Sequence, residues 1–173
     1  MNVFDTIRTA LAVRQFDPRP VPPEVVRQIV DAARLTGSSR NLQPWHFVVI
    51  DDPATLHQLG ALARTGPYIA QAPLAVVVLI ERTEYAISDA SRAIQSMVLA
   101  AWDAGVASNW VGWIGFGGID GARPLLGIPD SYDVLAIVPF GYPLTAVGAG
   151  KKQRKPQDEV VSYGRFGQPF GQS

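Results

Sequence analysis

Apolar residues recur along the chain at two spacings, and these spacings predict helices and strands. Near the start they recur every three or four positions, which is typical of an amphipathic helix, at Val3, Phe4, Ile7 and Leu11. The segment 16–24 holds four prolines and is predicted to be extended. Pro23 suits the first turn of a second helix, and Gly37 suits its C-terminal cap.

Four apolar runs predict the strands of a sheet. Residues 46–50 form a short β-branched run, and residues 132–141 form a longer one. The run 72–81 lacks alternation, which fits a strand that is covered on both faces. The run 107–115 is predicted to be a strand interrupted by glycine.

The segments between these strands carry helix signals. Asp52 followed by Pro53 is typical of an N-cap and a first helical residue. Residues 89–105 have a broad apolar face with small side chains, which indicates a long helix at the centre of the protein or at a subunit interface. Residues 120–129 predict a short helical turn. The fold class is therefore predicted as α+β, a mixed central sheet of about four to five strands flanked by helices.

Composition limits the class of protein. The 173 residues suit a single domain covering 1–173, and 47% of them are hydrophobic, as in a globular protein. The 15 basic and 15 acidic residues cancel, which argues against general nucleic-acid binding. The chain has no cysteine, so disulfides and cysteine-bound metals are excluded.

No targeting or membrane signal is evident. The N-terminus lacks a long apolar core after a basic start, so a signal peptide is not expected. The longest apolar run is too short for a membrane helix. We therefore expect a soluble, cytoplasmic protein. The polar, glycine-rich tail 148–173 is expected to be either disordered or an arm that packs on a second subunit.

The stretch 36–50 places several polar residues directly before a strand. Asn41 and Gln43 could be turn residues, or they could hydrogen-bond the edge of a planar heterocycle, since an amide is both donor and acceptor. His46 and His57 have no acidic or histidine neighbour at ligand spacing, so no metal site is expected.

Two glycine-containing stretches resemble phosphate loops only superficially. Residues 115–118 and 148–152 complete neither common nucleotide-binding motif. The basic run could be a solvated tail or a clamp for a phosphomonoester, and it contains Lys151, Lys152, Arg154 and Lys155. No Ser–His–Asp set or pair of carboxylates can be assembled, so an enzyme with this sequence would need a cofactor.

Taken in order, the motifs resemble those of the FMN-dependent nitroreductase family. That family has R-R-S-x-R-x-F, a proline-led helix and P-S-x-x-N-x-Q-P-W before a strand. This sequence has ALAVRQF, PVPPEVVRQIVDAARLTG and GSSRNLQPWHFVVI. The segments LLGIPDSYDVLAIVPFGYP and KKQRKPQDEVVSYGRFG also follow in family order, so the resemblance covers nearly the whole chain.

The resemblance implies an FMN site and a set of residues that form it. Ser38 and Asn41 would contact the flavin, with Asn41 on the pyrimidine edge. Arg14 would lie near the ribityl chain and the N1–C2 edge, and Lys152 with Arg154 would bind the phosphate. The backbone of Gly117 and Gly118 would approach the ring face. The resemblance also implies a homodimer with FMN at the subunit interface and the arm 148–173 on the partner.

By the same resemblance, the activity is electron transfer from NAD(P)H to nitroaromatic, quinone or related acceptors by a ping-pong flavin mechanism. Ala10 and Ala12 stand where the family has Arg and Ser, which removes groups near the phosphate; Arg40 is a candidate to compensate. A flavin-binding protein without reductase turnover, or a relative that fragments flavin, remains an alternative. The sequence selects neither NADH nor NADPH, and it does not identify the acceptor.

Overall fold

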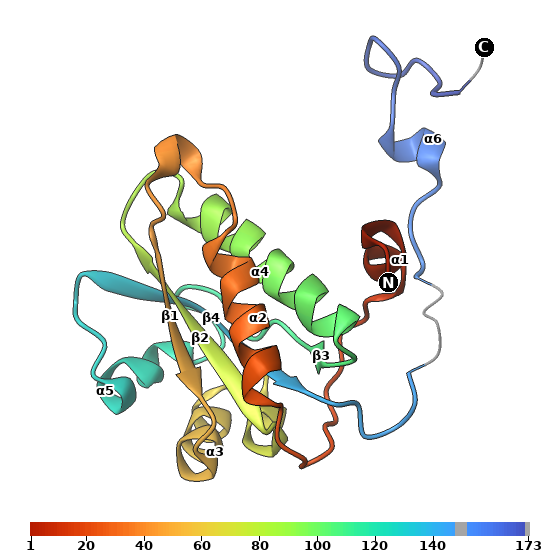
Figure 1. Cartoon of the computed structure of the whole chain (residues 1–173). Helices are drawn as coiled ribbons and strands as arrows, with labels where there is room; N and C mark the ends of the chain where they lie inside the picture. Colours follow the sequence, from red (N-terminus) through yellow and green to blue (C-terminus); the bar gives the residue numbers. More distant parts are fainter. Residues whose placement is uncertain (148–151, 172–173) are drawn as a thin grey trace.

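Four strands form the central sheet of the protein, in a computed structural model that describes residues 1–147 and 152–171 (Figure 1). The strand order is β1-β2-β4-β3, and each pairing between these strands is antiparallel. Val77 at the centre of β2 lies opposite Val48 of β1 and Ile137 of β4. The strands are β1 Trp45–Ile50, β2 Leu74–Glu81, β3 Ala107–Ser108 and β4 Tyr132–Gly141.

Helices cover both faces of this sheet. The apolar side chains at 74, 76, 78 and 80 of β2 pack with α2 and α4, and those at 75, 77 and 79 pack with α3 and the segment 119–122. The prediction that this strand is covered on both faces is therefore confirmed. The helices are α1 Val3–Thr9, α2 Pro23–Arg34, α3 Pro53–Leu62, α4 Ala86–Asp103, α5 Ala122–Leu126 and α6 Gln157–Val160.

Helix ends follow the local sequence in one case and depart from it in another. The Asp52 side chain accepts a hydrogen bond from the backbone N–H of Thr55 at 2.8 Å, so the predicted start of α3 at Pro53 is confirmed. The predicted cap at Gly37 is wrong, because α2 ends at Arg34. Just past this end, the Thr36 hydroxyl lies within hydrogen-bond distance of Ala32 O at 2.9 Å and of Ser96 Oγ on α4 at 2.7 Å.

The strand predicted at 107–115 is much shorter than expected. Only Ala107 and Ser108 form a ladder, and Val111 makes an isolated bridge to Ile137. The chain then reverses, with the backbone N–H of Phe116 donating to Trp113 O at 2.7 Å. Gly112 and Gly115 adopt positive φ, which ends the extended conformation. Among the residues that the structure describes, parallel pairing is limited to an isolated bridge between Ala12 and Ser108, so the mixed character of the sheet is slight.

The first helix and the C-terminal arm leave apolar side chains uncovered. Helix α1 packs near the C-terminal end of α4, where Trp102 Nε1 donates to Thr9 Oγ1 at 2.9 Å. Its Val3 and Phe4 are 74% and 72% exposed. The arm extends away from the sheet beside α1 (Figure 1) and exposes Val160, Tyr163, Phe166 and Phe170.

Within the described ranges, no helix is both long and apolar enough to cross a membrane. Residues 148–151 and 172–173, which include Lys151 of the basic run, lie outside the described residues.

Candidate functional site

The loop between α2 and β1 has an unusual backbone conformation. Arg40, Asn41 and Gln43 have φ values of 53°, 57° and 51°, in the left-handed region that non-glycine residues rarely adopt. Each such residue costs about 1–2 kcal/mol relative to a right-handed conformation. Asparagine tolerates this region better than arginine or glutamine, so contacts must hold the loop in place.

Hydrogen bonds within the loop organise its polar side chains. Ser38 Oγ accepts from the backbone N–H of Gln43 at 2.9 Å, and Asn41 Oδ1 accepts from Gln43 Nε2 at 3.3 Å. Ser38 is half-buried, whereas Arg40, Asn41 and Gln43 are exposed. Asn41 is thus an exposed turn residue whose Oδ1 accepts from Gln43. It could take part both in the turn and in the recognition of a heterocycle edge.

A basic hollow lies between α1 and the start of the arm. Its volume is about 420 Å³, and it is lined by Phe4, Ile7, Arg8, Lys152 and Arg154. The Lys152 ammonium donates to Ile7 O, one of the carbonyls left without a partner at the end of α1. Among the described residues, the lining holds three cationic side chains and no carboxylate, and one of the three, Arg8, also pairs with Asp5 of the same helix at 3.4 Å.

The electrostatics of this hollow favour an anion. Burial lowers the pKa of Lys152, and the neighbouring positive charge of Arg154 lowers it further. A phosphate dianion placed there would relieve the repulsion between the two cations. Arg8 was not predicted from the sequence. It lies far along the chain from the basic run, and only the packing of the arm against α1 brings it into the hollow.

Arg14 is not among the residues that line this hollow. The backbone N–H of Val13 donates to Ser108 O at 3.0 Å, which ties this segment to β3. Val13 and Phe16 are buried, so Arg14 between them points to solvent. Its guanidinium is therefore accessible at the edge of the sheet.

The structure places Gly117 and Gly118 against residues 62–65 of the same chain. Gly117 O accepts the backbone N–H of Arg64 at 2.8 Å. A Cβ on Gly118 would lie 2.5 Å from Leu62 O, and both glycines have φ near 80°. Close packing within the chain is thus sufficient reason for glycine at position 118.

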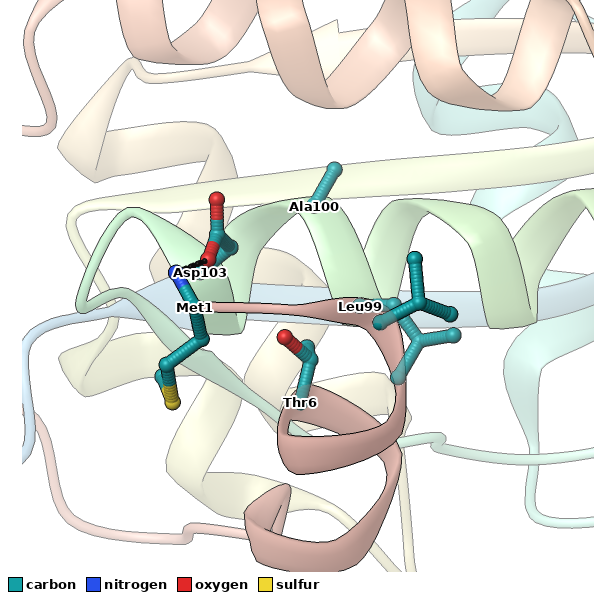
Figure 2. A pocket seen from close by; sticks show the side chains of 6 residues that line it. Met1, Thr6, Leu99, Ala100 and Asp103 are labelled. Atoms are coloured by element: carbon teal, nitrogen blue, oxygen red, sulfur yellow. Dashed lines mark hydrogen bonds and ion pairs between the residues drawn. The ribbon is translucent and has the colours of Figure 1, made fainter.

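The loop and the basic hollow lie at opposite ends of α4 (Figure 1). The loop contacts Asp89 in the first turn of α4. Helix α1 contacts its last turn, where the amino group of Met1 pairs with Asp103 at 2.6 Å beside a hollow of about 230 Å³ (Figure 2). At 1.5 Å per residue, these two carboxylates are roughly 20 Å apart along the helix axis. The structure therefore does not bring the two sets of predicted site residues together within one chain.

Comparison with known proteins identifies the fold and the family. The FMN-dependent nitroreductase of Clostridium difficile R20291 superimposes with a TM-score of 0.85 at 26% identity, covering 94% of this chain and 99% of that one. The protein therefore has the nitroreductase fold. The model named Nitroreductase family matches residues 7–83 and 63–142. The chain belongs to the nitroreductase family, as its motifs suggested.

Two relatives extend this comparison. A Methanothermobacter thermautotrophicus protein, provisionally named NADH dehydrogenase/NAD(P)H nitroreductase, is 30% identical over 149 residues, covering 83% of this chain and 78% of the relative. The FMN reductase [NAD(P)H] of Bacillus subtilis strain 168 is 26% identical over 181 residues, covering 92% of this chain and 72% of the relative. Both are similar over most of their length.

Proposed function

We propose that this protein is an FMN-dependent oxidoreductase that takes electrons from NAD(P)H and passes them to nitroaromatic, quinone or related acceptors. The family match over residues 7–142 carries the proposal. The names of the relatives, an NAD(P)H nitroreductase and an FMN reductase, support the general chemistry. The choice of acceptors and the ping-pong order of reaction go further than those names and are part of the proposal.

The residues of this chain fit an FMN molecule in two places. The basic hollow suits the phosphate, because Arg8, Lys152 and Arg154 supply charge-assisted donors. The exposed amide of Asn41 suits the pyrimidine edge of the flavin, with Ser38 beside it, and the accessible Arg14 suits the N1–C2 edge. Bound there, FMN would supply the redox chemistry that links NAD(P)H to the acceptor.

A homodimer would bring these two places together. In one chain they lie at opposite ends of α4, so the loop of one subunit would face the basic hollow of the other across a shared interface. The exposed apolar side chains of α1 and of the arm provide surface that a partner would cover. We therefore propose FMN at the subunit interface, with the arm on the partner.

An absorption spectrum tests the proposal most directly. The protein purified without added flavin should show the flavin bands or should acquire them on titration with FMN. A colourless protein that takes up no FMN would contradict the proposed function. NAD(P)H oxidation that depends on an added acceptor separates the reductase from a flavin binder without turnover. Irreversible loss of FMN under reducing, aerobic conditions would indicate the flavin-fragmenting alternative.

Asn41→Leu should weaken flavin binding or shift the flavin potential while the fold is retained, because the amide is lost and the bulk is similar. Leucine is also strained at a φ of 57°, so Asn41→Gly is the matched variant that removes the amide without strain. Flavin titration of both variants separates the two causes. If Asn41→Gly binds flavin as the wild type does and keeps its potential, Asn41 is only a turn residue.

A further inference from the structure

Asp89 is a buried carboxylate beneath the loop Ser38–Gln43. Its side chain has 0% exposure. Its Oδ2 accepts the backbone N–H of Ser39 at 3.0 Å, and its Oδ1 accepts a hydrogen bond from the guanidinium of Arg92. A carboxylate removed this fully from water is stable only when it is paired and hydrogen-bonded, so its contact with the loop is part of how the buried charge is satisfied.

The loop depends on this contact because its other hydrogen bonds are local. Asn41 N–H donates to Ser38 O, and Gln43 N–H donates to Ser38 Oγ. Such bonds move with the loop and cannot fix it relative to the sheet. Among the described residues, two hydrogen bonds link residues 37–43 to another element. The backbone N–H of Trp45, at the start of β1, donates to Gln43 O at 2.8 Å, next to the loop in the chain, and the bond from Ser39 to Asp89 is the one that reaches an element distant in sequence.

Asp89 is held in place by the packing of α4. Asp89 belongs to the first turn of α4, and the neighbouring Ala90, Ala93 and Ile94 are buried in the core beneath the sheet. A carboxylate in the first turn also lies at the positive end of the helix dipole, which stabilises its charge. The loop is thus attached to a fixed, charged acceptor.

From these contacts we propose that Asp89 is a positioning residue that holds the strained loop in the conformation that presents Asn41 to the flavin. This inference rests on the proposed FMN-dependent function. Asp89 does not touch the ligand in this arrangement. It acts through Ser39, two residues before Asn41, so that flavin binding need not drive the loop into its left-handed conformation.

The test compares Asp89→Ala with Asp89→Asn, because the asparagine oxygen can still accept the Ser39 N–H. In the apoprotein, amide hydrogen exchange of residues 39–43 should be faster in Asp89→Ala and near the wild-type rate in Asp89→Asn. The Kd values for FMN and for riboflavin should both rise about tenfold or more in Asp89→Ala, by the same factor, since the loop would contact the ring and not the phosphate. Asp89→Asn should recover most of this loss.

Two further variants complete the test: Ile94→Ala controls for a loss of stability, and Ser39→Pro is a second way to break the bond between Ser39 and Asp89. Ile94→Ala removes core volume from the same helix without a contact to Ser39; it should lower the Tm and leave both Kd values unchanged for the folded protein. Ser39→Pro removes the backbone N–H that donates to Asp89, together with the serine hydroxyl, and leaves the buried carboxylate itself unchanged. Ser38 already has φ −126° and ψ 157°, the extended conformation that precedes proline. Ser39→Pro should weaken binding of both ligands even if Asp89→Ala fails to fold.

The outcomes separate this inference from the function on which it rests. Unchanged exchange at 39–43 in Asp89→Ala would overturn the anchoring role, and faster exchange with unchanged Kd values would overturn its importance for flavin. A loss in Asp89→Asn as large as that in Asp89→Ala would show that the hydrogen bond is not the cause. A wild-type protein that binds no flavin would overturn the proposed function, and this inference with it.

Discussion

Deletion of residues 149–173 should weaken the dimer and release FMN, while the sheet and the helices that cover it stay folded. The arm contributes no buried side chain to the core within 152–171, and the core residues end at Phe140. In the described part of the chain, the bond from Lys152 to Ile7 is the one hydrogen bond between the arm and the rest of the protein. Removal of the arm therefore costs the isolated subunit little.

The arm matters because of what it would cover and what it carries. Phe166 is 103% exposed and Tyr163 is 71% exposed, which is a large aromatic surface to leave in water. The deletion also removes two of the three cations of the basic hollow, Lys152 and Arg154. Loss of partner contacts and loss of phosphate donors should thus occur together.

Sedimentation velocity, far-ultraviolet circular dichroism and flavin absorbance measure the three expected effects of the deletion separately. A truncated protein of unchanged association state that retains FMN would contradict both the arm contact and the phosphate role. A truncated protein with lost helical signal would instead show that the arm supports the subunit itself. Deletion of residues 164–173 is the matched control, because it removes Phe166 and Phe170 but keeps Lys152 and Arg154. It should weaken the dimer more than it alters phosphate recognition.

Local signals in the sequence predicted the parts of the fold that depend on local physics. The Asp52–Pro53 pair gave the start of α3, because an N-cap and a first-turn proline act within one turn. The continuous apolar run of β2 gave its burial on both faces. The order of motifs gave the family, which the comparison with known proteins confirmed.

Features that depend on tertiary packing could not be predicted in this way. Helix α2 ends at Arg34 and not at Gly37, and the Thr36 hydroxyl beyond its end contacts Ser96, sixty positions further on. Left-handed conformations at Arg40 and Gln43 have no signal in the residue type, since neither favours positive φ. Asp89 carries no motif that connects it with the loop.

The first helix shows a different limit. The spacing of Val3, Phe4, Ile7 and Leu11 predicted a first helix, and α1 forms over Val3–Thr9, so Leu11 lies beyond its end. Val3 and Phe4 face solvent in the isolated chain. Periodicity reports that an apolar face exists and does not say which molecule covers it. The same limit applies to Arg8, whose place in the basic hollow comes from the position of the arm.

Arg154→Ala should lower the affinity for FMN by about ten- to a hundredfold and leave the affinity for riboflavin almost unchanged, because riboflavin lacks the phosphate. Ala10 replaces the arginine of the family motif, so the remaining cations should each carry more of the phosphate affinity than they would beside an intact motif. Lys155→Ala is the matched control. It removes a charge from the same basic run, but Lys155 does not line the hollow.

Comparison of Arg8→Ala with Arg40→Ala then identifies the side chain that compensates for Ala10. Arg8 lines the hollow with Arg154, whereas Arg40 lies at the other end of α4 in the same chain. We expect Arg8→Ala to reduce FMN affinity selectively, as Arg154→Ala does, with little change for riboflavin. A selective loss in Arg40→Ala alone would show that the partner's loop supplies the missing cation.

Equal losses for FMN and riboflavin in Arg154→Ala, or no loss for either, would mean that the basic run is a solvated linker, because a phosphate donor must distinguish the two ligands.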